Sequence, residues 1–361
     1  MSVLAARQLF SGDRAFFKQE RYQELQHQEV ASSNPPAKPF YTLELESKVW
    51  RVVKVIFGVL LFPLGIYWMI HSLIGRITVP ASNSFLFGKN AVRNCRLASC
   101  GSPDWAFKRV AVHVDGYVVD AMLFGKKETL DNGRWVIASN GNGEFYEQKL
   151  GDHSFKQLLV ELDANALVFN YPGVEGSSGW PSRSAMVKAY RAMLTLLEDP
   201  DKGIGAKEIV GYGHSIGGGV QADALAQHTL RSDVKYVFIK SRTFSTLASV
   251  AASLTNRLLG FLAWVFGWSF NTLDSSKKLK VPEIILQTAK VPEYTDIQSR
   301  PDLIVHDGVI PAEPSLAKGL LNSTEPYKGI KHFIGIPEGH NESLSDTRFL
   351  AGKVNELLAA Q

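Results

Sequence analysis

A serine flanked by glycines in Gly-His-Ser-Ile-Gly (213–217) is the motif of this 361-residue chain that most clearly suggests chemistry. A serine hydroxyl is a weak nucleophile unless a sharp strand-to-helix turn presents it to a base, and small residues relieve the crowding of such a turn. Residues 207–212 (KEIVGY) predict a strand before Ser215, and residues 217–230 are compatible with a helix after it. Ser215 is therefore the predicted nucleophile of an acyl transfer, and a glycine-rich helix start without chemistry is the alternative.

The base that must activate this serine is expected to be a histidine that follows it in the chain. In this arrangement the nucleophile, the acid and the histidine occur in the order Ser, acid, His. The histidines after Ser215 are His228, His306, His332 and His340. His228 falls in the helix expected behind the serine, and His332 opens the last predicted strand. His340 follows that strand in Glu-Gly-His-Asn, a loop from which an imidazole can return to the nucleophile, so His340 is the predicted base.

The acid is expected in the long loop that follows the strand predicted at 283–288 (EIILQT). Its carboxylates include Asp296, Asp302 and Asp307. Asp307 heads Asp-Gly-Val-Ile-Pro, a turn whose apolar residues would bury one carboxylate oxygen near the site. Asp307 is therefore the predicted acid, with Asp302 as the alternative.

The carbonyl oxygen under attack becomes an oxyanion, which preorganised backbone N–H groups must stabilise. One donor is expected from Ile216, directly after the nucleophile. The other is expected from the glycine-rich loop 139–143 (SNGNG), where the backbone can approach the substrate closely. Asn142 is the predicted donor and Asn140 the alternative, whereas a simple hairpin turn would explain the Asn-Gly pattern without any oxyanion hole.

The elements that must hold these residues follow from short β-rich runs that alternate with helical stretches from about residue 107. Residues 108–124 predict a hairpin around Asp115-Gly116, and residues 182–197 predict a helix. Further strands are predicted at 135–139, 166–171, 208–212, 236–240, 283–288 and in KHFIGIP at 331–337. This order predicts an α/β protein with the α/β-hydrolase fold, in which a mostly parallel central sheet is flanked by helices.

The N-terminal part is predicted to consist of two segments ahead of the catalytic domain. Residues 1–48 are polar and charged, show no secretory signal and end in a linker rich in proline and serine. Residues 49–79 are hydrophobic and reach about 20 apolar residues, the length that crosses a hydrocarbon core. The glycines and the proline in the middle of this stretch suit a kinked helix, a re-entrant hairpin or a segment at the interface as well as a straight span. Membrane contact is predicted, and packing against the rest of the protein is the alternative.

The hydrolase domain is predicted to cover 80–361, with an apolar cap inserted at about 244–278. Tryptophans stand near the end of the apolar run in this insertion, which suits an acyl-binding lid or an interfacial anchor, while a buried helix is the alternative. The predicted substrate-binding residues lie in this run, namely Leu258, Phe261, Leu262, Trp264, Phe266 and Trp268.

Composition excludes several other classes of function. The 39 basic residues nearly balance the 35 acidic ones and form no long basic run, so binding to nucleic acid is not expected. Cys95 and Cys100 are predicted to be free thiols, although they could pair with each other. The nine histidines show no paired ligand spacing, so neither a metal nor another cofactor is expected.

Several motifs together resemble one family of α/β hydrolases, the SidB-type effectors of Legionella and the related chlamydial 43 kDa proteins. The resemblance extends from the apolar N-terminal segment to the C-terminus, and Ser215, Asp307 and His340 occupy the matching triad positions. It implies a bacterial protein that is delivered into host cells and acts as a lipase or lysophospholipase. The motifs are SNGNGE (139–144), NYPGVEGSSG (170–179), GHSIGGG (213–219), SRTFSTL (241–247), DGVIP (307–311) and EGHN (338–341).

These features predict a membrane-associated serine hydrolase that cleaves acyl esters of lipids through an acyl-enzyme, as a lipase, lysophospholipase or carboxylesterase. An acyl-protein thioesterase at membranes would use the same triad. A hydrolase-like protein that binds membranes without catalysis is the non-enzymatic alternative. The sequence specifies neither the oligomeric state nor the acyl chain and head group.

Overall fold

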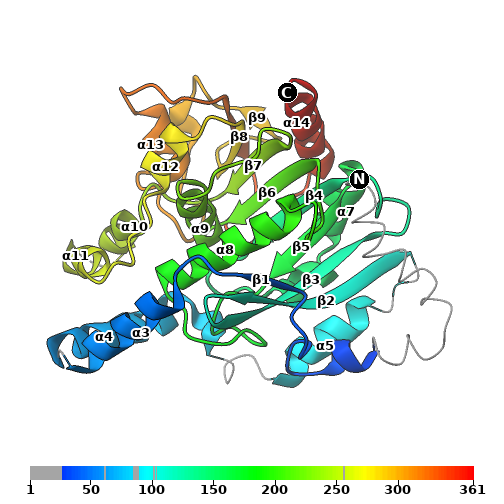
Figure 1. Cartoon of the computed structure of the whole chain (residues 1–361). Coiled ribbons are helices and arrows are strands. Elements are labelled where there is room, and N and C mark those ends of the chain that lie inside the picture. Colours follow the sequence, from blue (N-terminus) through cyan, green and yellow to red (C-terminus); the bar gives the residue numbers. More distant parts are fainter. Residues whose placement is uncertain (1–26, 61, 84–88, 101, 103, 255–256) are drawn as a thin grey trace.

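One mixed sheet of ten strands organises the chain, with the strand order β1-β2-β3-β5-β4-β6-β7-β8-β10-β9 (Figure 1). The structure is a computed structural model, and it describes residues 27–361 apart from 61, 84–88, 101, 103 and 255–256. The strands are β1 (Tyr41–Leu43), β2 (Trp105–Val114), β3 (Tyr117–Lys126), β4 (Arg134–Ser139), β5 (Asn165–Phe169), β6 (Glu208–His214), β7 (Lys235–Ser241), β8 (Glu283–Thr288), β9 (Thr295–Asp296) and β10 (Lys331–Ile336).

The central strands β5, β4, β6, β7, β8 and β10 pair in parallel, whereas β3 and β9 pair antiparallel with their neighbours in this set. Parallel strands present their carboxyl ends at one common edge of the sheet. The loops after β4, β6, β8 and β10 therefore meet at that edge, although they are far apart in the sequence. Each strand predicted from the sequence is present, with ends that differ by at most a few residues.

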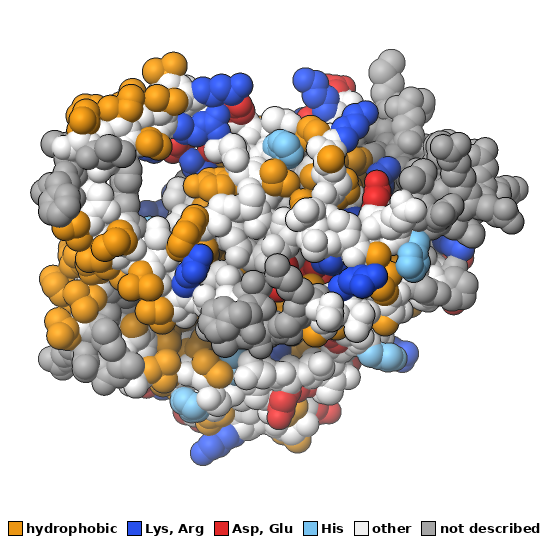
Figure 2. Space-filling model, turned by 90° about the horizontal axis from the view of Figure 1, so that it is seen from below, with side chains coloured by type: hydrophobic (Ala, Val, Ile, Leu, Met, Phe, Trp, Pro, Cys, Tyr) orange, Lys and Arg blue, Asp and Glu red, His pale blue; other side chains and the backbone are white. Residues whose placement is uncertain are grey.

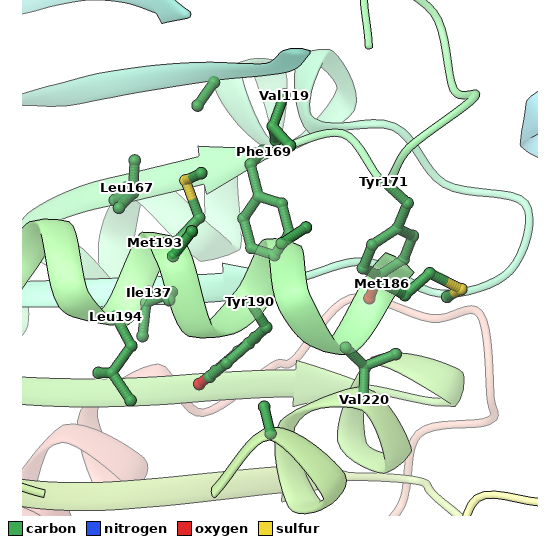
Figure 3. Packing of buried hydrophobic residues seen from close by; sticks show 14 of the residues in the cluster. Val119, Ile137, Leu167, Phe169, Tyr171, Met186, Tyr190, Met193, Leu194 and Val220 are labelled. Atoms are coloured by element: carbon green, nitrogen blue, oxygen red, sulfur yellow. The ribbon is translucent and has the colours of Figure 1, made fainter. Parts of the chain in front are cut away.

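Helices cover both faces of the sheet and enclose two large apolar cores. The buried side chains of α8 (Arg183–Glu198) and α9 (Ile216–Leu225) belong to one core, while those of α6 (Tyr146–Gly151), α7 (His153–Glu161) and α14 (Thr347–Ala359) belong to the other. Figure 3 shows the first core, where Leu194 of α8 lies beside Ile137 of the sheet. The ring of Tyr190 on α8 packs edge-on against that of Phe169, with centroids 6.2 Å apart. The sheet is thus fixed from both sides, which gives the loops at its edge a rigid base.

The hairpin predicted around residues 115 and 116 is present between β2 and β3. Asp115 and Gly116 both have positive φ angles, 47° and 89°, as a tight two-residue hairpin turn requires. The carboxylate of Asp115 also accepts hydrogen bonds from the backbone N–H groups of Leu45 and Glu46, at 2.7 and 3.1 Å. The turn therefore holds the chain that leaves β1.

Residues 27–47, the described part of the segment predicted as a polar extension and linker, take part in the folded domain. Strand β1 of this segment pairs in parallel with β2 at the edge of the sheet. The buried guanidinium of Arg109 forms an ion pair with Asp120 at 2.6 Å and donates to the carbonyl oxygens of Glu29 and Ser32 at 2.9 and 2.7 Å. Arg96, also buried, donates to the carbonyl oxygen of Ser32 at 2.8 Å. This segment thus supplies carbonyl acceptors to two buried cations, in addition to their carboxylate partners Glu147 and Asp120.

The predicted hydrophobic segment forms a helical hairpin of α3 (Lys48–Leu60) and α4 (Phe62–Thr78), followed by η1 (Pro80–Ser82) and α5 (Lys89–Cys100). A second apolar hairpin, α10 (Leu247–Leu254) with α11 (Arg257–Val265), leaves the domain after β7, ahead of α12 (Thr272–Lys278). Both hairpins protrude from the same side of the molecule in Figure 1. Of the helices in the described ranges, none combines the length and hydropathy that a membrane span requires. Cys95 and Cys100 are free thiols, as predicted.

Candidate active site

Ser215 occupies the sharp turn between β6 and α9 that the sequence predicts. Its backbone has φ 53° and ψ −122°, a conformation that an L-residue adopts only at a cost and that is common at functional turns. A Cβ atom on Gly213 would lie 2.8 Å from the Cα atom of Gly218, and one on Gly217 would lie 2.5 Å from the carbonyl oxygen of Ser139. The glycines of the motif are therefore required by close backbone contacts around the serine.

A chain of hydrogen bonds connects Ser215 to His340 and Asp307. The Oγ atom of Ser215 lies 3.0 Å from Nε2 of His340, and Nδ1 of His340 lies 2.7 Å from Oδ2 of Asp307. The other oxygen of Asp307 accepts hydrogen bonds from the backbone N–H groups of Val309 and Ile310, at 2.8 and 2.6 Å. Burial opposes the charge of Asp307, but these hydrogen bonds and His340 outweigh it and hold the pKa of the carboxyl below its usual value.

The loop that carries His340 is fixed by the strand that precedes the second hairpin. The guanidinium of Arg242, directly after β7, donates to the carbonyl oxygens of Gly339 and Glu342, the latter at 2.8 Å. The carboxylate of Glu342 in turn accepts from the backbone N–H of Gly339 at 2.8 Å. The carbonyl oxygen of Glu338 accepts from the hydroxyl of Thr288 at the end of β8 at 2.7 Å. The imidazole is thus positioned by several elements at the same edge of the sheet.

The competing residues from the sequence lie elsewhere. Asp302, the alternative acid, is an exposed residue of η2 (Pro301–Leu303) that forms an ion pair with Arg300 at 3.2 Å. His228 contacts Glu198 at 2.7 Å on the α9 side of the sheet, and His306 accepts a hydrogen bond from the backbone N–H of Gly308 at 3.0 Å. Of the carboxylates considered in the loop after β8, Asp307 is thus the one that contacts His340.

The oxyanion-hole candidates lie on either side of Ser215. Ile216 is the first residue of α9, and Asn142 belongs to the loop after β4 that lines the pocket containing Ser215. Asn140 is fully buried under this loop, where its amide nitrogen donates to the carbonyl oxygen of Phe169 at 3.0 Å. The backbone N–H of Gly141 already donates to Glu144 at 2.7 Å. Of the two asparagines, Asn142 lines the pocket that contains Ser215 and Asn140 does not.

A pocket of about 900 Å³ opens beside Ser215 and His340. Its walls come from the loop after β4, from α6, from the start of α7 and from the loop that carries His340. Apart from glycines, the side chains that line it are polar, which suits a hydrogen-bonding ligand group. They are those of Asn142, Glu144, Gln148, Lys149, Asp152, His153, Ser154, His214, Ser215, His340, Asn341 and Ser343.

His214 and Glu144 are pocket residues that the sequence analysis did not select. The ring of His214 lies 4.9 Å from that of His340, and its Nε2 atom lies 3.8 Å from Glu144. Burial lowers the pKa of His214 to about 3, although Glu144 opposes this shift. Burial would raise the pKa of Glu144, but Lys149 and His214 lower it to about 2. The position of His214 directly before the nucleophile was the one signal in the sequence that could have placed this residue in the pocket.

The predicted substrate-binding residues do not line this pocket, as far as its described walls show. Trp268 is wholly buried in the core, and its indole N–H donates to the carbonyl oxygen of His71 at 3.1 Å, so its prediction as a substrate-binding residue is wrong. Phe266 packs against the ring of Tyr67. The other four belong to α11, where Leu262 is half-buried and three are exposed, namely Leu258, Phe261 and Trp264.

A bound metal has no evident place in the described part of the chain, because no group of three or more His, Cys, Asp or Glu side chains is arranged there to hold one.

Comparisons with known proteins agree with this fold. The family described as Chlamydia CHLPS protein (DUF818) matches residues 25–359. The α/β-hydrolase domain-containing protein WAV2 of Arabidopsis thaliana is 25% identical over 173 residues, which cover 42% of this chain and 54% of that protein. The chain thus spans about half the length of this curated relative.

Solved structures provide the second comparison. An α/β hydrolase from Vibrio vulnificus matches with a TM-score of 0.50 and 17% identity, over 91% of this chain and 98% of that one. The esterase Pf2001 of Pyrococcus furiosus matches with a TM-score of 0.49 and 14% identity, over 71% of this chain and 90% of that one. With the strand order and the turn at Ser215, the first of these likenesses confirms the predicted α/β-hydrolase fold.

Proposed function

The chain belongs to the Chlamydia CHLPS protein family (DUF818), and on this premise we propose that it is a serine hydrolase that cleaves acyl esters. The observation that carries the proposal is the hydrogen-bonded series from Ser215 through His340 to Asp307. A buried carboxylate that orients an imidazole against a serine at a strained turn is the arrangement that activates a serine hydroxyl.

In this proposal the Oγ atom of Ser215 attacks the ester carbonyl carbon while Nε2 of His340 accepts its proton. Asp307 keeps the imidazole hydrogen on Nδ1 and stabilises the imidazolium that forms. His340 then gives the proton to the leaving alcohol, and the acyl group stays on Ser215. A water molecule, deprotonated by His340, attacks the acyl-enzyme. The bond between the acyl carbon and Oγ then breaks, the carboxylic acid leaves, and His340 returns its proton to Oγ of Ser215.

The backbone N–H groups of Ile216 and Asn142 are the proposed donors to the oxyanion of each tetrahedral intermediate. The N–H groups at the start of a helix have no partner within that helix, which leaves the amide of Ile216 suited to this task. Glu144 supports the second donor, because its carboxylate accepts from Gly141 and thereby fixes the loop that carries Asn142. A preorganised donor of this kind typically contributes about 10²- to 10³-fold to the rate.

We extend the proposal to lipids as the source of the acyl ester, so that the protein would act as a lipase, lysophospholipase or carboxylesterase. Two features support this substrate class. The polar walls of the pocket offer hydrogen bonds to a polar leaving alcohol or head group. The exposed apolar side chains of α11, such as Phe261 and Trp264, offer an apolar surface of the kind that acyl chains favour.

Hydrolysis of p-nitrophenyl acyl esters by the purified protein, compared with Ser215→Ala, tests the proposal. The wild type should turn over the esters and react with a fluorophosphonate probe, and Ser215→Ala should lose at least about 10³-fold in kcat and all labelling. If the wild type shows neither Ser215-dependent turnover nor labelling, the enzyme proposal is wrong and a non-catalytic hydrolase-like effector takes its place.

A comparison of two substrates distinguishes the lipid proposal from the alternative that the protein is an acyl-protein thioesterase. Vesicles that contain lysophospholipid and vesicles that carry an S-acylated peptide are incubated with wild type and Ser215→Ala. The lipid proposal expects Ser215-dependent release of fatty acid from lysophospholipid, whereas faster release from the peptide favours the thioesterase. We also propose that the protein is an effector of the SidB type that is delivered into a host cell. A secretion assay in a bacterium that produces the protein would test this delivery.

A further inference from the structure

Exposed apolar side chains are concentrated in the two hairpins, α3–α4 and α10–α11. Of the twenty exposed large hydrophobic side chains in the described part of the chain, sixteen belong to these four helices. Figure 2 shows hydrophobic side chains gathered along one side of the molecule, at its left. The sixteen are Val49, Trp50, Val52, Val55, Ile56, Phe57, Leu60, Ile66, Met69, Leu73, Ile77, Leu254, Leu258, Phe261, Trp264 and Val265.

Contacts between the hairpins make them one surface, although they are nearly two hundred residues apart in the chain. The Nδ1 atom of His71 on α4 donates to the carbonyl oxygen of Phe266, directly after α11, at 2.6 Å. The indole of Trp268 donates back to the carbonyl oxygen of His71 at 3.1 Å. The rings of Tyr67 and Phe266 stack with centroids 5.7 Å apart. Because Trp268 is buried in the main core, these contacts also anchor the hairpins to the domain.

The charges of the hairpins point to the chemistry of the partner. The four helices contain no Asp or Glu, whereas their basic residues are Lys48, Arg51, Lys54, Arg76 and Arg257. Acidic partners of three of these, Glu44 and Glu46, lie before α3, and partly exposed ion pairs of this kind contribute little free energy. A surface with exposed aromatic and aliphatic side chains and only basic charges complements an anionic lipid surface. Facing a second copy of itself, the same surface would place like charges together.

We propose that α3–α4 and α10–α11 together form a docking surface that inserts into one leaflet of an anionic membrane. With 13 and 17 residues, α3 and α4 extend about 20 and 26 Å at 1.5 Å per residue, less than the roughly 30 Å of a hydrocarbon core. A Cβ atom on Gly65 would lie 2.9 Å from the carbonyl oxygen of Gly58, so the two helices fold back closely on each other. A compact hairpin of this kind enters and leaves from the same side. The proposal does not depend on the reaction proposed above.

Flotation of the full chain with vesicles tests this surface. Wild type is mixed with vesicles of phosphatidylcholine alone or with one quarter phosphatidylserine, at low and high salt. We expect flotation with the anionic vesicles and weaker flotation at high salt, since salt screens the basic residues. Phe57→Ser with Leu60→Ser changes the first hairpin, and Phe261→Ser with Trp264→Ser changes the second. Each double variant should bind at least tenfold more weakly, because it removes two large apolar side chains from the lipid contact.

Matched controls distinguish docking from loss of the fold or of activity. Val160→Ser with Ile330→Ser removes two exposed apolar side chains outside the hairpins and should float as the wild type does. Ser215→Ala should also float normally, so that a failed reaction and a failed docking surface remain distinguishable. Circular dichroism verifies that every variant is folded.

Three outcomes would overturn the proposal. The first is a wild type that floats with neither kind of vesicle. The second is a loss of binding confined to one hairpin, which would separate the two parts of the surface. The third is a stable dimer in light scattering that the hairpin substitutions convert to a monomer, because a second copy would then cover the surface.

Discussion

His340 and Asp307 are joined twice, once through side chains and once through the backbone. The imidazole Nδ1 lies 2.7 Å from the carboxylate, and the backbone N–H of His340 donates to the carbonyl oxygen of Asp307 at 2.6 Å. The loop after β10 is therefore held in register with the loop after β8. Because Arg242 fixes the far side of the His340 loop, the orientation of the base is set before any substrate binds.

Asp307→Asn should lower kcat by about 10³- to 10⁴-fold with little change in the fold, because an amide favours the wrong imidazole tautomer. Steady-state hydrolysis of a p-nitrophenyl ester measures the effect. The matched control is Asp302→Asn, an exposed carboxylate of the same loop, which should keep wild-type activity. Equal losses in both variants would contradict the assignment of Asp307.

Gly217→Ala should reduce activity and destabilise the protein by about 1–3 kcal/mol, the usual cost of inserting a methyl group into a filled space. The added Cβ atom would lie 2.5 Å from the carbonyl oxygen of Ser139, at the start of the loop that carries Asn142. Urea unfolding and ester hydrolysis measure the two effects. The control is Gly352→Ala in α14, where a Cβ atom meets nothing within 4 Å and should raise stability by about 0.5–1 kcal/mol. A neutral Gly217→Ala would mean that the loop can move aside.

His214 should contribute a loss of stability as the pH falls below neutral, which a comparison with a variant lacking this imidazole isolates. Its folded pKa is about 3 against an ordinary 6.5, so between these values the unfolded chain binds a proton that the folded protein does not. This difference lowers the free energy of unfolding as the pH falls, by at most about 1.4 kcal/mol per pH unit. From pH 6.5 to 5 wild type should lose roughly 1.5 kcal/mol more than His214→Gln.

Urea unfolding at several pH values measures this difference. The range stops at pH 5 because Glu144, with a folded pKa of about 2, adds a slope of the same sign below its ordinary value of 4.5. Parallel pH profiles for wild type and His214→Gln would show that His214 is protonated in the folded protein.

Glu283→Gln should destabilise the protein by about 3–5 kcal/mol, because removing one partner leaves buried charges uncompensated. Glu283 on β8 lies between Lys240 of β7 and Lys331 of β10, and it forms an ion pair with each. The ammonium group of Lys331 is 2.5 Å from the carboxylate, and all three side chains are fully buried. Burial lowers the pKa of Lys240 well below its usual value and that of Lys331 to about 7, whereas the adjacent carboxylate of Glu283 favours their charged forms. The midpoint of urea unfolding measures the loss, with Asp302→Asn as an exposed ion-pair control. A loss under about 1 kcal/mol would indicate neutral lysines in the folded state.

The strands and the triad candidates were predictable from the sequence because local signals and chain order agree there. The apolar run before Gly213 specifies a buried strand, and glycines on both sides of Ser215 specify the turn. Asp307 could be preferred over Asp302 because apolar residues follow it, and these are the residues whose backbone N–H groups bind its carboxylate.

Other features depend on contacts between distant residues, which leave no periodic pattern. A tryptophan is compatible with both a lid and a core. Trp268 is buried because α4 packs against it, with His71 accepting its indole hydrogen bond, and its neighbours in sequence do not indicate this contact. Strand β1 is three residues long and follows a proline-rich stretch, and it forms because β2 offers it an edge. His214 and Glu144 meet because parallel strands β4 and β6 end side by side.

Arg96 and Arg109 donate hydrogen bonds to carbonyl oxygens of residues 29–32, and these contacts limit how far the chain can be shortened from its N-terminal side. A truncated version that starts at residue 49, as composition would suggest, removes the acceptors at Val30 and Ser32 and uncovers guanidinium groups that are otherwise sealed from solvent. A version that starts just before residue 27 keeps them. The part of the chain that must be kept together therefore begins ahead of the hydrophobic hairpin, in the segment that contains Val30 and Ser32.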